Sequence, residues 1–333
     1  MKDNRFFHAS YLLFLSILFV ACSSQTNAPL AASSTQNPTA PTVATRASQS
    51  SASATVASAP LELVRRISGD PNPFSMPAAL SFDSNGNMYV LDAGNSRVQV
   101  FDPSGGFVTL WGSEGSGEGQ FELVAHEDTV YSVGGIALDK NNDVFVVDAL
   151  NHRLQKFDST GKYLMEWGGY GLNDGQFVRP IDVAVDAQGN VYVVDDHRDD
   201  IQKFDSQGNF IGKFGSHGTG DGQLNNTGGI TIGPDGNLYL ADYGNNRVEV
   251  FTPDGQYLKQ WPTTSRDVDI AFDSKGNSFT THENGDLVEY DSSGEPISII
   301  NSLGLNSPVG IAVDANGLIY VADNNGIEVF MEK

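Results

Sequence analysis

Two aspartates interrupt a pattern of small residues that recurs along the chain, and they are the side chains best placed to do chemistry. Asp182 and Asp269 stand at equivalent places of a repeated segment, where other copies have Ala79, Gly135, Gly229 and Gly310. Carboxylates that share a mouth can bind a divalent cation or a cationic ligand, and they can act as bases. We therefore place these two residues at the centre of the candidate site.

Histidine and arginine depart from the same pattern nearby. Residues 195–200 read Asp-Asp-His-Arg-Asp-Asp where other copies have an Asn-x-Arg sequence, and His282 replaces an aspartate that usually ends a strand. An inserted loop, 122–133, adds His126. If these residues share one face, they form an acidic, histidine-containing mouth. The predicted ligand-binding set is Asp182, Asp196, His197, Arg198, Arg266, Asp269 and His282, with Asp182, Asp269 and His197 as candidate ligands for Ca²⁺ or Zn²⁺. The alternative is a solvated acidic rim.

The elements that position these residues are short strands. Residues 134–177 contain four runs that alternate apolar and polar side chains, each bounded by Gly, Asn or Asp, as expected for an antiparallel meander. The unit recurs with a period of roughly forty to fifty residues, which is typical of solenoids, propellers and arrays. Three Asp–Arg pairs within the copies are candidate ion pairs: Asp92 with Arg97, Asp148 with Arg153, and Asp242 with Arg247.

The segment GGIALDKNNDVFVVDALNHRLQKFDSTGKYLMEWG, which starts at Gly134, resembles an NHL repeat, with Asn151, His152 and Arg153 at the signature position. Six concordant copies cover nearly all of residues 61–333. The resemblance implies an all-β fold, a six-bladed β-propeller of four-stranded antiparallel blades. The last copy lacks a fourth strand, so we expect residues 63–67 to complete the last blade and close the ring.

The N-terminal part of the chain predicts export and lipid anchoring. Residues 1–22 place Lys2 and Arg5 before an apolar run that is too short for a spanning helix, and they end at Cys22, the chain's one cysteine, in a sequence that resembles a bacterial lipobox. Residues 23–60 are rich in Ser, Ala, Thr and Pro, as in a disordered tether. The predicted domains are thus the signal peptide with its lipobox Cys (1–22), the tether (23–60) and the propeller (61–333). The predicted location is the extracytoplasmic face of a bacterial cell membrane.

Charge and motifs exclude several classes of function. The net charge of −22 repels phosphate backbones, so we expect no nucleic acid partner and no membrane contact beyond the lipid. No serine-hydrolase elbow, helical zinc motif or cysteine pair is present. Peptide-amidating lyases of this fold hold zinc through histidines that would fall here on Ala78, Gly134, Ile181, Gly228, Val268 and Val309, none of which binds metal.

Two functions remain. The first is a binding scaffold for an extracellular peptide, glycan or envelope protein, since repeat propellers present a rigid face of loops. The second is a metal-dependent lyase or lactonase at the acidic mouth, in the manner of the virginiamycin-type lyases and lactonases that share the six-bladed form. No catalytic motif supports this second function, because a fold alone does not determine an activity.

Overall fold

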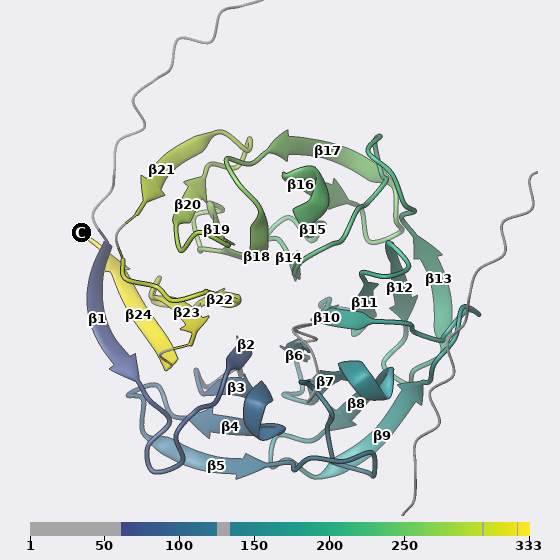
Figure 1. Ribbon diagram of the computed structural model, residues 1–333, viewed down its shortest axis with the longest axis horizontal. Coiled ribbons are helices and arrows are strands. Elements are labelled where there is room, and N and C mark those ends of the chain that lie inside the picture. The colour runs from purple at the N-terminus through teal and green to yellow at the C-terminus, as the bar shows by residue number, and fades with distance from the viewer. Residues whose placement is uncertain (1–60, 125–133, 302, 325) are drawn as a thin grey trace, which may run out of the picture. The chain divides into compact units, whose positions relative to one another are not determined.

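The computed structural model describes residues 61–124, 134–301, 303–324 and 326–333. These residues form six four-stranded antiparallel sheets, which stand as blades around a central axis (Figure 1). The predicted six-bladed propeller is therefore confirmed. Cys22 and the inserted residue His126 lie outside the described residues.

Each blade runs from an inner strand next to the axis to an outer strand at the periphery (Figure 1). Blade one consists of β2 (Pro77–Phe82), β3 (Met88–Asp92), β4 (Arg97–Phe101) and β5 (Phe107–Trp111). Blade two consists of β6 (Ile136–Leu138), β7 (Val144–Asp148), β8 (Arg153–Phe157) and β9 (Tyr163–Gly168). Blade three consists of β10 (Pro180–Val185), β11 (Val191–Asp195), β12 (Asp200–Phe204) and β13 (Phe210–Phe214).

The remaining blades repeat this order. Blade four consists of β14 (Ile230–Ile232), β15 (Leu238–Asp242), β16 (Arg247–Phe251) and β17 (Tyr257–Pro262). Blade five consists of β18 (Asp267–Phe272), β19 (Ser278–His282), β20 (Leu287–Tyr290) and β21 (Pro296–Ile300). Blade six consists of β22 (Gly310–Val313), β23 (Ile319–Asp323), β24 (Gly326–Glu332) and β1 (Leu61–Ile67). Short 3-10 helices follow the second strand of blades one, two and four: η1 (Ala93–Asn95), η2 (Ala149–Asn151) and η3 (Tyr243–Asn245).

The ring is closed by the two ends of the propeller. Strand β1 is the outer strand of blade six, and it pairs antiparallel with β24 from Leu61 opposite Glu332 to Ile67 opposite Ile327. The predicted closure is thus confirmed, with β1 starting at residue 61. The outermost strand of the last blade therefore comes from the beginning of the propeller, which ties its first and last blades together.

Local rules in the sequence account for the hairpins of each blade. In blade one, Asp83 Oδ1 accepts hydrogen bonds from the backbone N–H groups of Asn85 and Asn87, both at 2.8 Å. Gly86 has a φ of 81°, which a residue without Cβ adopts at little cost. Asp139 makes the same contacts in blade two, with Asn141 and Asp143. These aspartates therefore stabilise turns.

In every blade except blade five, a buried aspartate at the end of the second strand ties the blade to the loop that enters it. Asp148 is fully buried and pairs with Arg153 Nε at 2.8 Å, while its Oδ1 accepts the N–H of Glu122 in the preceding crossover at 2.8 Å. The predicted pairs Asp92–Arg97 and Asp242–Arg247 are also present, each at 2.7 Å. Because the aspartates are buried, the arginines are needed to offset the cost of desolvating them.

Aromatic side chains fill the space between neighbouring blades. Trp111 of blade one packs on Phe157 of blade two, with ring centroids 6.1 Å apart, and Phe121 of the crossover packs on the same ring at 5.7 Å. Trp167 and Phe204 repeat the contact between blades two and three at 5.9 Å. These rings belong to the core, so the tryptophans stabilise the stacking of the blades.

Candidate functional site

Two cavities follow the axis of the propeller and share a waist. The larger, of about 620 Å³, is lined by residues that precede or begin the inner strands and by loops after the second strands, and we call it the upper cavity. The smaller, of about 360 Å³, is lined by the inner strands of all six blades, and we call it the lower cavity. Three residues line both cavities: Ala79, Asp182 and Asp269. The two predicted central residues thus lie at the waist.

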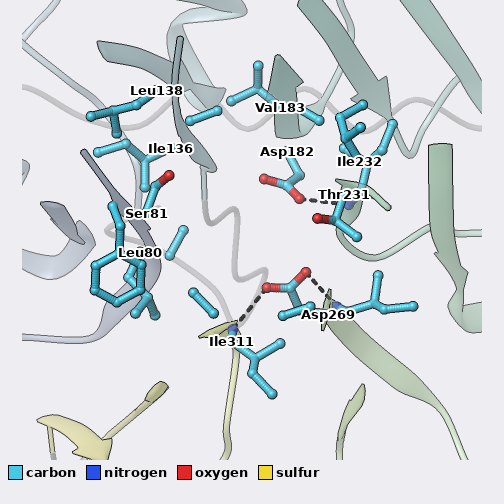
Figure 2. Close-up of a pocket in the computed structure, with 18 of the residues that line it drawn as sticks. Leu80, Ser81, Ile136, Leu138, Asp182, Val183, Thr231, Ile232, Asp269 and Ile311 are labelled. Carbon is cyan, nitrogen blue, oxygen red and sulfur yellow. Dashed lines mark hydrogen bonds between the residues drawn. The ribbon is translucent and has the colours of Figure 1, made fainter. Parts of the chain in front are cut away.

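Asp182 reaches across a blade boundary. It lies on β10 of blade three, opposite Val194 of β11, and its Oδ2 accepts a hydrogen bond from the N–H of Ile230 in blade four at 2.8 Å. Figure 2 shows its carboxylate projecting into the channel. The bond to Ile230 leaves the other oxygen, Oδ1, on the side of Gly135 in blade two.

Asp269 repeats this arrangement two blades further on. It lies on β18, opposite Thr281 of β19, and its Oδ2 accepts the N–H of Ile311 in blade six at 3.0 Å (Figure 2). Its Oδ1 accepts the N–H of Ile270 at 2.8 Å. Each aspartate therefore accepts a hydrogen bond from the inner strand of the next blade. Blade four lies between the two blades that carry the aspartates.

The small residues at the equivalent positions make room for the two carboxylates. A Cβ atom on Gly135 would lie 1.9 Å from Asp182 Oδ1, and a Cβ atom on Gly229 would lie 1.9 Å from Asp269 Oδ1 and 3.2 Å from Asp182 Oδ2. Because one point beside Gly229 is close to both carboxylates, the two groups are near neighbours. The pattern of small residues and aspartates in the sequence is thus a packing requirement of the waist.

The waist favours the protonated form of both aspartates. Burial raises the pKa of Asp182 to about 7, and the hydrogen bonds from Ile230 and Val183 only partly oppose this effect. Burial also raises the pKa of Asp269 well above its usual range, and the negative charge of Asp182 raises it further. No ion pair joins either carboxylate to a cationic side chain in the part of the chain that the structure describes. Removal of a proton therefore leaves a charge that the protein does not neutralise.

Arg179 and Asp196 lie at the rim of the upper cavity. Their side chains form an ion pair, Arg179 Nε to Asp196 Oδ1. The neighbouring His197 is exposed and does not line either cavity. Arg198 turns away into blade three, where it pairs with Asp200 at 2.9 Å. Of residues 196–198, the structure thus brings only Asp196 to the cavity.

Of the predicted residues Arg266 and His282 of blade five, only Arg266 lies beside residues of the upper cavity. Arg266 stacks over the ring of Tyr243 at 5.1 Å and lies 3.6 Å from Glu283, and both of these partners line the upper cavity. His282 is fully buried, with Nδ1 2.6 Å from Ser265 Oγ and Nε2 2.9 Å from Thr280 Oγ1. It occupies the place of the strand-ending aspartates inside the blade, away from the waist.

The predicted metal ligands do not gather into one group. Among residues 61–124, 134–301, 303–324 and 326–333, no three His, Cys, Asp or Glu side chains are placed to hold a metal ion together. Asp182 and Asp269 are close, whereas His197 is exposed on a loop. The assignment of Ca²⁺ or Zn²⁺ to these residues stays a prediction.

Three ionisable residues of the upper cavity were not predicted from the sequence: Arg179, Tyr243 and Glu283. Arg179 lies directly before the inner strand of blade three, Tyr243 begins η3, and Glu283 follows β19. All three come from positions next to strand ends that face the axis. Their place in the repeat was visible in the sequence, but the direction of each side chain was not.

Comparison with known proteins agrees with the repeated pattern. The NHL repeat family matches residues 74–101, 131–157, 224–251 and 305–329, which correspond to most of blades one, two, four and six. Together with the six-bladed ring, this match identifies the repeats of the propeller as NHL repeats. The chain is an NHL-repeat propeller. Blades three and five of this NHL-repeat propeller lie outside the matched segments, and they are the blades that carry Asp182 and Asp269.

Among curated proteins, the NHL-repeat propeller is similar to the protein brain tumor of Drosophila melanogaster, with 36% identity over 66 residues. This stretch is 20% of the present chain and 6% of that protein. The likeness therefore concerns repeat sequence over a short part of a much longer relative.

Solved structures with the same fold include enzymes. A virginiamycin B lyase from Staphylococcus aureus is 17% identical, with a TM-score of 0.57 over 79% of this chain and 82% of that one. A gluconolactonase from Xanthomonas campestris is 13% identical, with a TM-score of 0.59 over 78% of this chain and 87% of that one. At these identities the likeness shows the fold alone.

Proposed function

We propose that this NHL-repeat propeller is exported, anchored by a lipid, and binds an extracellular ligand in its upper cavity. The observation that carries the proposal is the waist: two carboxylates without a cationic partner lie at the floor of a cavity of about 620 Å³, on the two blades that depart from the repeat. A cavity of this size with a few convergent polar groups is typical of ligand sites. The ligand belongs to the envelope: a peptide, a glycan or part of another protein.

Anchoring rests on the sequence of the N-terminal part. Residues 1–21 have the order of charged, apolar and small residues of a lipoprotein signal, and Cys22 follows them. Within the described residues, none of the helices has the length and apolar character needed to cross a membrane. Metabolic labelling with palmitate tests the anchor: the wild type should incorporate label and Cys22→Ser should not. Equal labelling of both would contradict it.

Ligand binding is tested by blocking the upper cavity. Ile181 is half-buried in its lining, so Ile181→Trp should fill part of the space. Native mass spectrometry of protein purified from its producing cells should show a bound molecule on the wild type that Ile181→Trp lacks. Val108→Trp, on the exposed outer face of blade one, serves as the matched control and should keep it. Equal occupancy of both variants would place the ligand elsewhere.

A second candidate function is a lyase or lactonase that acts at the same waist. The raised pKa values of Asp182 and Asp269 favour it, because a carboxyl group that titrates near neutral pH can accept or donate a proton. The fold of the lyase and lactonase structures agrees with this role. Hydrolysis of a panel of lactones that is lost in Asp182→Ala would support an enzyme, and sensitivity to chelators would implicate a metal. No turnover would leave the binding function.

A further inference from the structure

We propose that the upper cavity binds an organic cation, with an ammonium group between Asp182 and Asp269 and an apolar body against the cavity wall. This inference rests on the proposed binding function, since it names the chemistry of the ligand for the same cavity. Three observations support it: the charge at the waist, the composition of the wall, and the geometry of the two carboxylates.

The charges of the upper cavity are neutralised everywhere except at its floor. Arg179 pairs with Asp196, and Glu283 lies near Arg266 and accepts a hydrogen bond from Tyr243 at 2.9 Å. These four lining residues, Arg179, Asp196, Tyr243 and Glu283, are the other ionisable groups of the described lining. Asp182 and Asp269 accept hydrogen bonds only from backbone N–H groups of the described residues. A cationic ligand would supply the counter-charge that the protein lacks.

The wall above the carboxylates is mainly apolar. Its described residues include Met76, Ala78, Ile181, Val268, Pro308 and Val309. An apolar body bound there would leave water and gain free energy in proportion to the area buried. The combination of an apolar wall and an acidic floor fits an amphipathic amine better than a sugar, because a sugar needs hydrogen-bonding groups around its whole circumference.

The waist suits an ammonium group better than a bare divalent cation. An ammonium has three N–H donors, and one point beside Gly229 lies close to oxygens of both aspartates. Ca²⁺ takes six to eight oxygen ligands, whereas the described residues offer no group of three acidic, histidine or cysteine side chains there. Three of the four carboxylate oxygens already accept a backbone N–H, which restricts the directions open to a metal.

Binding of a cation should release protons. Burial raises the pKa of both carboxyl groups, that of Asp182 to about 7, and an ammonium nearby favours their charged form. The affinity should therefore rise as the pH increases from 5 to 8. Asp196 at the rim is the other lining carboxyl group with a raised pKa: burial raises it, and the ion pair with Arg179 opposes the shift.

Isothermal titration calorimetry of the purified full chain tests the inference, with 2-phenylethylamine and n-hexylamine as probes and 2-phenylethanol and 1-hexanol as their neutral counterparts. At pH 8 the amines should bind at least tenfold more tightly than the alcohols. The amines should bind at least tenfold more weakly at pH 5 than at pH 8. Because binding releases protons, the measured heat of binding should vary with the ionisation enthalpy of the buffer. Equal affinity of amines and alcohols would overturn the inference.

Two variants assign the binding to the waist. Asp182→Asn with Asp269→Asn should weaken the amines at least tenfold, whereas Asp174→Asn, which removes an exposed carboxylate paired with Lys213 on the outer face, should leave the affinity unchanged. If the double substitution does not fold, Ile181→Trp serves as a second variant and should prevent the amines from binding. Binding that survives both variants would overturn the inference.

The result separates this inference from the proposed function. If Ile181→Trp removes a native ligand that is neutral or anionic, the binding function stands and the organic cation is wrong. If Ca²⁺ binds with one-to-one stoichiometry and displaces the amines, a metal takes their place and the inference fails. If neither probe nor native ligand binds, both proposals fail.

Discussion

The carboxylate of Asp182 accepts a hydrogen bond from the backbone N–H of Ile230, which belongs to the next blade, at 2.8 Å. Asp269 and Ile311 repeat this contact at 3.0 Å. Each aspartate therefore satisfies one polar group on the inner edge of a neighbouring strand, but it brings a charge into the channel that no described side chain neutralises. The contact is compatible with an asparagine, so the charge itself has no structural requirement.

Small residues beside the carboxylates should be needed for folding. Gly135→Ala should lower the melting temperature by several degrees, because its Cβ would lie 1.9 Å from Asp182 Oδ1. The double variant Gly135→Ala with Asp182→Gly should recover most of the loss, since removing the carboxylate frees the space. Thermal unfolding measures both. If the double variant melts no higher than Gly135→Ala, the clash is not the cause.

Glu249 should make the stability depend on pH. It is fully buried on β16, where the equivalent residue of blade two, Gln155, donates a hydrogen bond to Asp148. Burial raises the pKa of Glu249 to about 7; Arg247 opposes this shift and the charge of Asp242 adds to it. Because the folded-state pKa is raised, the stabilisation is present below the ordinary pKa of glutamate and is lost as the pH rises through about 7.

The substitution Glu249→Gln should therefore stabilise the protein at pH 8 by about 1 to 3 kcal/mol and have little effect at pH 4. Denaturant unfolding at the two pH values measures it. The reverse change in blade three, Gln202→Glu, should destabilise the protein at pH 8, because it places a charged carboxylate at a buried position. A pH-independent effect of Glu249→Gln would show that its proton is not involved.

The ion pair of blade two should contribute far more than one at the surface. Arg153→Ala leaves the fully buried Asp148 without its partner, and we expect a loss of about 3 to 5 kcal/mol. Lys213→Ala breaks an exposed pair with Asp174 and should cost less than about 1 kcal/mol. Chemical denaturation compares the two variants. Similar losses would mean that burial does not set the strength of these pairs.

Closure of the ring should depend on β1. Ile67 is buried opposite Ile327, so deletion of residues 61–67 removes the outer strand of blade six and its contacts with blade one. We expect the melting temperature to fall by more than 10 °C, since the loss exposes both apolar surface and the edge of β24. Val64→Ala, at an exposed position of the same strand, is the control and should change it little. An unchanged melting temperature after the deletion would contradict the closure.

The blades could be predicted from the sequence because their rules are local. The short apolar run of residues 144–147 indicated a buried strand, and the Gly, Asn and Asp residues that bound the strands indicated the hairpins. The pairing of Asp148 with Arg153 also followed, since they are five positions apart across one turn. Closure by β1 followed from counting strands in the first and last copies.

The site could be predicted only in part. Asp182 and Asp269 were found because they break a repeat. The closed ring of blades places both of them at the central channel. The direction of loop side chains was not fixed: His197 is exposed, whereas Arg179 reaches the cavity. The burial of His282 had a signal in the sequence, because it occupies the place at which Asp148 is buried inside its own blade.

The most direct test of a ligand site at the waist is the thermal stability of Asp182→Asn with Asp269→Asn between pH 4 and pH 8. Asparagine can still accept hydrogen bonds from the N–H groups of Ile230 and Ile311, but it removes the charges at the waist. Since the folded-state pKa of both aspartates is raised, they make the wild type lose stability as the pH rises, and the variant, which keeps Glu249, should lose less.

We expect the double variant to melt several degrees above the wild type at pH 8 and close to it at pH 4. This outcome would show that the carboxylates destabilise the propeller, as expected of residues retained for binding. A double variant that melts below the wild type at pH 8 would show that the charges stabilise the fold, and it would contradict the assignment of the waist as a ligand site.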